Sequence, residues 1–147
     1  MADSKRQQIV SALDTRLKTI LTTGGYETNL GNNVLWWRQT SFADTESGIS
    51  CEDSEAAPEW LGAQCQLHKL TVGIKVVMPV GTAAPEIRKA AADVVKAVAT
   101  DLTFGGLIED CILGEMPMDV GQEATMHGGT IINLSVEYTT APWDPYQ

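Results

Sequence analysis

Apolar residues recur at helical spacing in two segments of the chain. The stripe near the N-terminus consists of Ile9, Val10, Leu13, Leu17, Ile20 and Leu21. Gly24 and Gly25 follow it, and such glycines commonly end a helix. The second stripe begins after Pro85, a residue tolerated in a first helical turn, and consists of Ile87, Ala90, Ala91, Val94, Val95 and Val98. We therefore expect two helices, of which the second can pack closely on a sheet through its small side chains.

Two other segments alternate between apolar and polar residues, which indicates half-buried strands. The inward positions are Leu70, Val72, Ile74, Val76, Met78 and Val80 after His68, and Ile132, Leu134, Val136 and Tyr138 near the C-terminus. Shorter strands are predicted at 34–39, around 49–53 and within 107–120, where Pro117 would weaken or bend the far end. This order predicts an α+β fold: a mainly antiparallel sheet of four to five strands with two helices packed on one face.

The outer face of this sheet is not expected to be fully polar. Trp36 and Trp37 are neighbours in a predicted strand, so one indole should point to each side of the sheet. Val77 and Ile131 also fall on the outward phase of their strands. An indole surrounded by branched aliphatic side chains can form an apolar patch of interface size, so Trp36 and Trp37 are candidate partner-binding residues.

The C-terminal segment has the sequence TTAPWDPYQ and follows the last predicted strand. Its two prolines prevent further ladder pairing, which divides the chain into a single domain at 1–138 and an extended arm at 139–147. Trp143 and Tyr146 provide the arm with two large aromatic anchors and complete the set of candidate partner-binding residues. Two interpretations remain open: the arm folds back on its own domain, or it clasps a neighbouring subunit, since Trp and Tyr are enriched in interface hot spots.

Composition limits the classes of partner. The chain has 147 residues, enough for one domain with one core, and carries a net charge of −9. Because that charge repels a phosphate backbone, nucleic-acid wrapping is disfavoured. The apolar runs are too short to span a bilayer and the N-terminus lacks a secretory pattern. We therefore expect a soluble protein that is not exported and has no membrane partner.

Acidic residues concentrate at 44–59, and neither Lys nor Arg occurs between Arg38 and Lys69. A run of one charge sign is typical of a solvated loop. The alternative is a docking surface for a basic partner, and the sequence leaves both interpretations open.

The segment TFGGLIED places Gly105 and Gly106 beside Phe104 and two carboxylates. A phosphate-binding loop has its glycines after a strand and before a helix, where free N–H groups and the positive end of the helix dipole meet the anion. Here the predicted order is the reverse, and the chain contains neither GxxxxGK nor GxGxxG. We therefore expect a turn in which the glycines adopt positive φ and Phe104 covers the end of the core.

The sequence contains no recognisable catalytic or metal-binding constellation. Neither His68 nor His127 stands in a GxSxG or Cys-His context. Cys65 and His68 have a C-x2-H spacing, with Cys51 as a conceivable third zinc ligand, but structural zinc sites take four ligands at tighter spacings. We therefore assign no catalytic, cofactor-binding or metal-binding residue and expect a protein that is not an enzyme.

Four segments resemble those of a known family: KRQQIVSALDTRLKTI, HKLTVGIKVV, DLTFGGLIED and VEYTTAPWDPY. They are similar to small tail-terminator or tail-completion proteins of long-tailed phages and prophages, and the resemblance covers nearly the whole chain. It implies a small α/β protomer that forms a ring, expected to be a hexamer, on the tip of the tail tube. Such a ring stops polymerisation of the major tail tube protein and presents a surface for a head–tail connector or neck protein. The acidic segment 44–59 departs from the family pattern.

The same resemblance implies a virion protein that is assembled in the host cytoplasm, with DNA in contact only as it passes through the channel. Two alternatives remain open. The nearer is another neck or minor tail component, such as a head-closure or adaptor protein. The more distant is a dimeric α+β domain outside phages that binds a small molecule, or an enzyme without a recognisable motif, and a deep apolar pocket with convergent polar groups would favour it.

Overall fold

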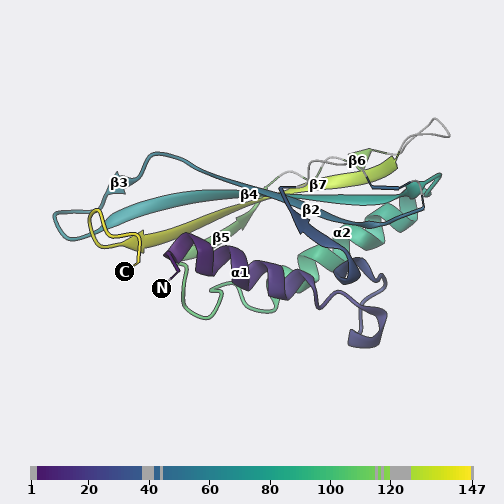
Figure 1. The fold of residues 1–147 in the computed structure, drawn as a ribbon, viewed down its shortest axis with the longest axis horizontal. Helices are drawn as coiled ribbons and strands as arrows, with labels where there is room; N and C mark the ends of the chain where they lie inside the picture. The colour runs from purple at the N-terminus through teal and green to yellow at the C-terminus, as the bar shows by residue number, and fades with distance from the viewer. Residues whose placement is uncertain are drawn as a thin grey trace.

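One sheet forms a layer of the molecule, and two helices cover one of its faces (Figure 1). The computed structural model describes residues 3–37, 42–43, 45–114, 116, 118–119 and 127–146. The helices are α1 (Lys5–Leu17) and α2 (Ala84–Ala99). The strands are β1 (Val34–Trp36), β2 (Gly48–Glu55), β3 (Glu59–Trp60), β4 (Gln66–Val80), β5 (Asp110–Leu113), β6 (Met118–Asp119) and β7 (His127–Thr140). No helix in the described part of the chain is long and apolar enough to cross a membrane.

The sheet is built around β4 and β7, which pair antiparallel over most of their length. The strand order is β1-β2-β4-β7-β5, and the two-residue strands β3 and β6 pair with β4 and β7. Among the described strands β1 and β2 pair in parallel and the other pairs are antiparallel, so the predicted α+β fold with a mainly antiparallel sheet is confirmed. The main path has five strands, as predicted, and β3 and β6 bring the sheet to seven.

The predicted inward positions of β4 and β7 form the middle of the core. Val72 pairs with Leu134 and Ile74 with Ile132, and all four side chains are buried. Both helices cover this face with buried side chains: Ile9, Leu13 and Leu17 of α1, and Ile87, Ala90, Val94, Ala97 and Val98 of α2. Each fully buried branched side chain contributes roughly 1.5–3 kcal/mol, so this layer contact is the main source of stability.

Helix α1 ends at Leu17, well before Gly24 and Gly25, which corrects the expected end of the helix. The residues that follow include β-branched Thr19 and Ile20, which have low helix propensity. The Thr19 hydroxyl donates to the Arg16 carbonyl at 2.6 Å and satisfies one of the free carbonyls at the helix end. Ile20 is buried as predicted although it lies outside the helix. The two glycines instead lie at the end of a short 3-10 helix, Thr22–Gly24, where Gly25 has a φ of +89°.

Helix α2 carries a buried carboxylate that its apolar stripe did not indicate. Asp93 is 3% exposed. Its oxygens accept hydrogen bonds from the N–H of Glu27 at 3.2 Å, the N–H of Thr28 at 2.8 Å and the Thr28 hydroxyl at 2.6 Å. These bonds fasten the connection between α1 and β1 to α2, and they satisfy a group that would otherwise be costly to bury.

The segment after α2 is a turn, as predicted. Gly105 and Gly106 have φ values of +71° and +87°, and Phe104 is 3% exposed at the end of the core. The Asp101 carboxylate accepts from the Thr103 hydroxyl at 2.7 Å, from the Thr103 N–H at 2.9 Å and from the Gly105 N–H at 2.8 Å. These hydrogen bonds, led by that of the Thr103 hydroxyl, lower the pKa of Asp101 below its ordinary value.

The outer face of the sheet is partly covered by the chain itself. Val77 has the outward phase but is only 7% exposed. Its partner Gly48 lies against Phe42, because a Cβ added at Gly48 would meet the Phe42 ring at 2.7 Å. Ile112 and Ile131 remain at the surface, 52% and 42% exposed. The expected apolar outer patch is therefore smaller than the sequence indicated.

The acidic segment 44–59 is mostly strand, so the solvated loop is wrong for its larger part. The short strand predicted around 49–53 is confirmed and extends to Glu55 as β2. Arg6 lies 2.6 Å from an Asp53 oxygen and 3.8 Å from a Glu55 oxygen, and Glu59 lies 3.5 Å from a lysine ammonium. Asp44 lies outside the described residues. Three of the acidic side chains thus have a cationic partner, and the segment is not a surface of a single charge sign.

Candidate interaction surfaces

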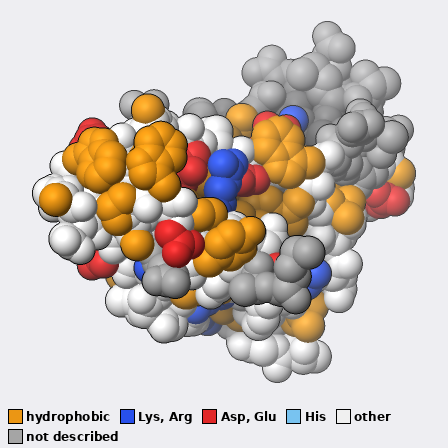
Figure 2. Space-filling view, turned by 60° about the vertical axis from the view of Figure 1, so that its left-hand side comes forward, with side chains coloured by type: hydrophobic (Ala, Val, Ile, Leu, Met, Phe, Trp, Pro, Cys, Tyr) orange, Lys and Arg blue, Asp and Glu red, His pale blue; other side chains and the backbone are white. Residues whose placement is uncertain are grey.

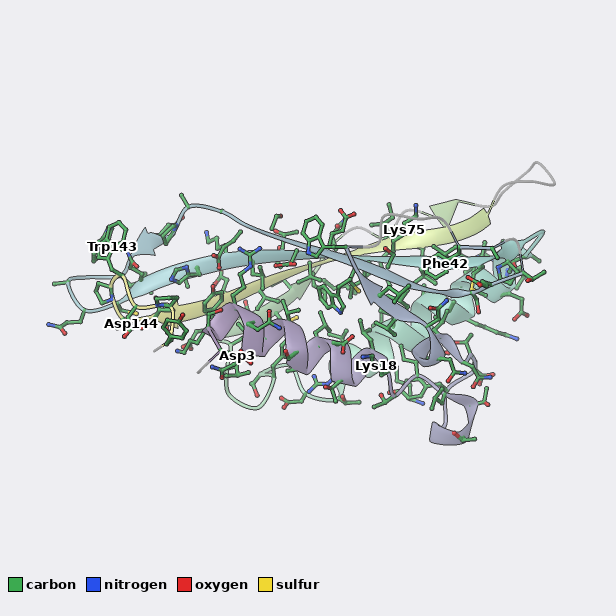
Figure 3. The ribbon with its side chains drawn as sticks, viewed as in Figure 1. Asp3, Lys18, Phe42, Lys75, Trp143 and Asp144 are labelled. Atoms are coloured by element: carbon green, nitrogen blue, oxygen red, sulfur yellow. The ribbon has the colours of Figure 1, made fainter. Side chains whose placement is uncertain are left out.

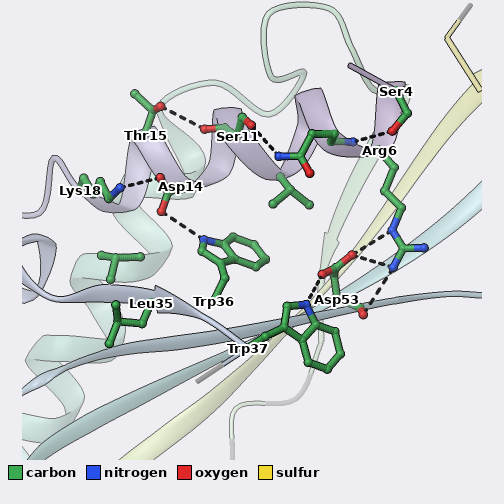
Figure 4. A pocket seen from close by; sticks show the side chains of 13 residues that line it. Ser4, Arg6, Ser11, Asp14, Thr15, Lys18, Leu35, Trp36, Trp37 and Asp53 are labelled. Carbon is green, nitrogen blue, oxygen red and sulfur yellow. Dashed lines mark hydrogen bonds and ion pairs between the residues drawn. The ribbon is translucent and has the colours of Figure 1, made fainter. Parts of the chain in front are cut away.

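Helix α1 and the edge strand β1 diverge and leave a groove of about 660 Å³ between them (Figure 4). The α1 side and its preceding cap supply Ser4, Arg6, Gln7, Val10, Ser11, Asp14, Thr15 and Lys18. The β1 side supplies Val34, Leu35, Trp36 and Trp37, and β2 adds Asp53. Two of the four candidate partner-binding residues therefore line one and the same groove, which is from here on called the α1–β1 groove.

Trp36 joins the two walls of the α1–β1 groove. Its indole Nε1 donates to Asp14 Oδ1 at 3.1 Å, and the other Asp14 oxygen lies 2.8 Å from the Lys18 ammonium (Figure 4). The indole also packs against the hydrophobic core as a partly buried group. This bridge holds helix and strand at a set separation.

Trp37 lies immediately after β1 and has a φ of +53°, a conformation that large side chains rarely adopt. Its side chain is 57% exposed, and its indole Nε1 donates to Asp53 Oδ1 at 2.9 Å. The other Asp53 oxygen, Oδ2, accepts hydrogen bonds from the Arg6 guanidinium (Figure 4). The expectation of one indole on each side of the sheet is thus wrong, because the strand ends at Trp36 and the alternation no longer applies at Trp37. The remaining residues of the predicted strand, Arg38 and Gln39, lie outside the described residues.

In the segment predicted as an extended arm, residues 141–146 form a compact turn. Strand β7 continues to Thr140, and the chain then reverses through a turn in which the Asp144 N–H donates to the Ala141 carbonyl at 3.1 Å. The Lys5 N–H donates to the Pro145 carbonyl at 2.8 Å, which ties the turn to the start of α1. The backbone therefore folds back on its own domain. Gln147 lies outside the described residues.

The aromatic side chains of this turn do not fold back with the backbone. Trp143 is 86% exposed and Tyr146 is 54% exposed. Trp143 occupies the third position of the turn with a φ of +60°, where glycine is ordinarily favoured, and its N–H donates to Gln66 Oε1 at 3.3 Å. Trp143 and Asp144 lie at one end of the long axis and Phe42 lies toward the other (Figure 3). The backbone of the turn is thus fastened to the domain, and the Trp143 indole points to the outside.

Two further exposed apolar residues lie beside this turn, and the sequence analysis missed them. Trp60 and Leu61 are each 55% exposed. Trp60 pairs with Gln66 in β4, and Gln66 pairs with Thr140 at the start of the turn. Figure 2, in which this end of the molecule comes forward, shows hydrophobic side chains gathered there with charged groups between them. The pattern EWLG offered a signal, because Trp and Leu are unusual within an acidic, polar stretch.

The polar residues at this end of the inner face belong to a structural network. The Tyr138 hydroxyl donates to Glu55 Oε1, and burial, more than this bond, raises the pKa of the phenol. The His68 ring stacks on Tyr138 with centroids 4.8 Å apart, and its Nε2 lies 2.8 Å from the Thr140 hydroxyl. These contacts fasten β4, β7 and β2 together. The buried His68 Nδ1 lies 3.7 Å from Glu55 Oε1 and has no hydrogen-bond partner within the described part of the chain.

The cysteine and histidine residues considered as zinc ligands are not brought together. Cys51 pairs with Ile74, six residues along β4 from His68, which corresponds to roughly 20 Å. Cys65 lies just before β4. All three cysteines are free thiols. His127 begins β7, and its side chain lies outside the described residues. In the described part of the chain no three His, Cys, Asp or Glu side chains gather in a way that could hold a metal ion.

Comparisons with known proteins add little to this geometry. No family model matches the sequence, and no curated protein matches it. Twenty-three chains of solved structures match. One of them aligns over 95% of this chain and 97% of its own length, with 16% sequence identity and a TM-score of 0.43. At that score the likeness carries no argument about function.

Proposed function

We propose that this protein is a structural subunit of a phage tail that closes the tail tube as a ring, ends its polymerisation and presents a surface for head–tail joining. One observation supports assembly with other subunits: Trp37 and Trp143 are exposed, and the backbone of both has a positive φ. Such a backbone costs about 1–3 kcal/mol for a residue other than glycine, and strain of this kind concentrates at functional sites. Because exposed indoles contribute little to the fold, contact with another molecule is the role that fits them.

The assignment to a tail is supported by the resemblance of four segments to tail-terminator proteins. Those segments form α1, most of β4, the turn after α2, and the end of β7 with the turn that follows it. They include one helix, parts of the two central strands and the turn that carries Trp143. An α+β protomer with both helices on one face of the sheet agrees with the small subunit that the resemblance implies.

The proposal names three kinds of partner. The first is the protein itself, in a ring expected to contain six copies. The second is the major tail tube protein, and the third is a head–tail connector or neck protein on the opposite side of the ring. Assembly then takes place in the host cytoplasm, the mature protein belongs to the virion, and DNA meets the ring only in passage.

Tube assembly tests this function directly. Tubes of the major tail tube protein from the same phage or prophage are assembled with and without the purified chain, and their lengths are measured by electron microscopy. We expect a ring at one end of each tube and an end to elongation, with six copies found by native mass spectrometry. A chain that stays monomeric and leaves tube length unchanged would contradict the proposal. Particles lacking the protein that have tails of normal length but no heads would favour the alternative of a neck component.

A further inference from the structure

We propose that the turn carrying Trp143 of one subunit inserts into the α1–β1 groove of a second copy of this chain. The inference rests on the ring assembly proposed above and names the two surfaces through which neighbouring subunits meet. It requires no tube and no neck protein, so it can fail or hold independently of the tail function.

The indole of Trp143 is available for contact with a second molecule. It is 86% exposed and does not line the groove of its own chain. The turn is fastened to its own domain through the Lys5–Pro145 hydrogen bond and through Gln66, so it is not free to reach the groove. Pro142 and Pro145 further restrict the turn, which reduces the entropy lost when it docks.

The α1–β1 groove is a binding site of suitable size and lining for an indole. Its volume of about 660 Å³ admits an indole with its neighbouring proline. Val10, Leu35 and the two indoles of Trp36 and Trp37 provide apolar surface along it. The indole N–H groups of Trp36 and Trp37 are bonded to carboxylates. Trp37 is 57% exposed, so its ring presents apolar surface on which an incoming indole can stack. An aromatic side chain buries about 150–250 Å² in such a contact.

Charge also favours contact between these two surfaces. Each chain carries a net charge of −9, so most pairs of surfaces on two copies repel each other. The groove is an exception, because its cations Arg6 and Lys18 balance Asp14 and Asp53. The turn at 141–146 carries one charged side chain, Asp144. The groove is neutral overall and the turn carries a single negative charge, so contact between them involves less repulsion than the net charge of −9 on each copy implies.

The contact joins two different surfaces, which makes it head-to-tail. Such a contact leaves one free turn and one free groove on every pair, so it propagates into a ring where the rotation between subunits closes and into an open filament where it does not. A patch that meets its own copy would stop at a dimer. The proposed geometry is thus the kind that a ring of identical subunits requires.

Two single variants test the surfaces separately. Trp143→Gly removes the indole at a position where positive φ favours glycine, so the thermal midpoint should stay unchanged or rise. Self-association should weaken by about thirtyfold or more, as for an aromatic hot spot. Leu35→Glu places a charge in the groove at a side chain that is already 38% exposed, and it should have the same effect on association. If Leu35→Glu fails to fold, Ser11→Trp replaces it as the groove variant. The new indole fills the groove from the exposed side of α1 and should weaken self-association in the same way.

Mixing the two variants provides the decisive measurement. Trp143→Gly retains an intact groove and Leu35→Glu an intact turn, so a pair of them has one working contact. In sedimentation velocity each variant alone should be monomeric, and the mixture should form a heterodimer and no ring. Leu35→Glu that assembles like the wild type, or a mixture that forms complete rings, would overturn the inference.

Other outcomes separate this inference from the tail function. Rings that need both surfaces but do not cap tubes would support the inference and refute the tail function. A wild-type chain that stays monomeric at every concentration and on tubes would refute both. A small molecule that copurifies in the groove, seen as a mass adduct absent from Leu35→Glu while assembly is unchanged, would overturn the inference. Phe104→Gly is the matched folding control, because Phe104 also has positive φ but is buried, and its loss should lower the melting temperature without affecting the contact.

Discussion

Cys51 shows how burial controls the chemistry of a single residue. Its side chain is fully buried on the inner face of β2, and this burial, followed by the charge of Asp14, raises the pKa of the thiol to about 12. The reactive species is the thiolate, so native Cys51 should remain unmodified by iodoacetamide at pH 8. Cys65 is partly exposed and should be modified, and denaturant should make both react. Mass spectrometry of the labelled peptides gives the result, and rapid native labelling of Cys51 would contradict its position.

The direction of this pKa shift also determines how Cys51 contributes to stability at alkaline pH. The folded pKa of Cys51 lies above that of an unfolded cysteine, about 8.5. The corresponding stability is therefore fully present below the unfolded value and is lost as the pH rises toward the folded value.

Asp101, in the turn after α2, contributes stability that is lost at acid pH, whereas the contribution of Cys51 is lost at alkaline pH. Its hydrogen bonds with Thr103 and Gly105 lower its pKa, so its contribution to stability is present above the unfolded pKa and is lost as pH falls through the folded pKa. Asp101→Asn should lower the melting temperature at pH 7, and the difference from the wild type should shrink below about pH 4. Thr103→Val removes the hydroxyl that contributes most, and NMR titration should then place the pKa of Asp101 closer to its ordinary value. A difference in melting temperature independent of pH would contradict this account.

At the scale of elements, β7 lies so close to β4 at Gly129 that a side chain has no room there. A Cβ added there would lie 2.0 Å from the Val76 carbonyl oxygen, which is backbone and cannot turn aside. Gly129→Ala should therefore destabilise the protein by about 1–3 kcal/mol or more, as overpacking does. The matched control is Gly73→Ala on β4, where the nearest atom would be 3.8 Å away, and it should change stability little. Urea denaturation compares the two, and equal midpoints would contradict the register.

Elements that depend on local periodicity could be predicted from the sequence. The alternation in β4 and β7 was sufficient to predict both strands, because one face of each is buried over most of its described length. The end of α1 was missed because Thr19 and Ile20 stop the helix by low propensity before the glycines are reached. Asp93 was missed because its partners lie 65 residues away in the sequence. Such a long-range hydrogen bond leaves no local pattern.

At the scale of the molecule, the candidate residues could be predicted but their arrangement could not. Large aromatic residues outside the core pattern identified Trp36, Trp37, Trp143 and Tyr146. The groove arises only when α1 packs beside an edge strand that follows it in the chain, and the exposure of Trp143 depends on a positive φ within a turn. Neither geometry follows from residue spacing.

Salt provides the last test, because it acts on the whole molecule. Every subunit carries a net charge of −9 at pH 7, so bringing copies together costs repulsion that counterions screen. The Debye length falls from about 30 Å at 0.01 M to about 3 Å at 1 M salt. The proposed contact between turn and groove is nearly neutral and largely apolar, and salt does not weaken an apolar contact.

We therefore expect self-association to strengthen as sodium chloride is raised from 0.01 M to 1 M, measured by sedimentation equilibrium. Raising the pH from 7 to 8 at low salt should have little effect, since few groups titrate there. The variant Trp143→Gly should remain monomeric across the salt series, because screening removes repulsion but cannot replace the missing indole. Association that weakens with salt would mean that charge pairs, and not the Trp143 turn in the α1–β1 groove, hold the subunits together.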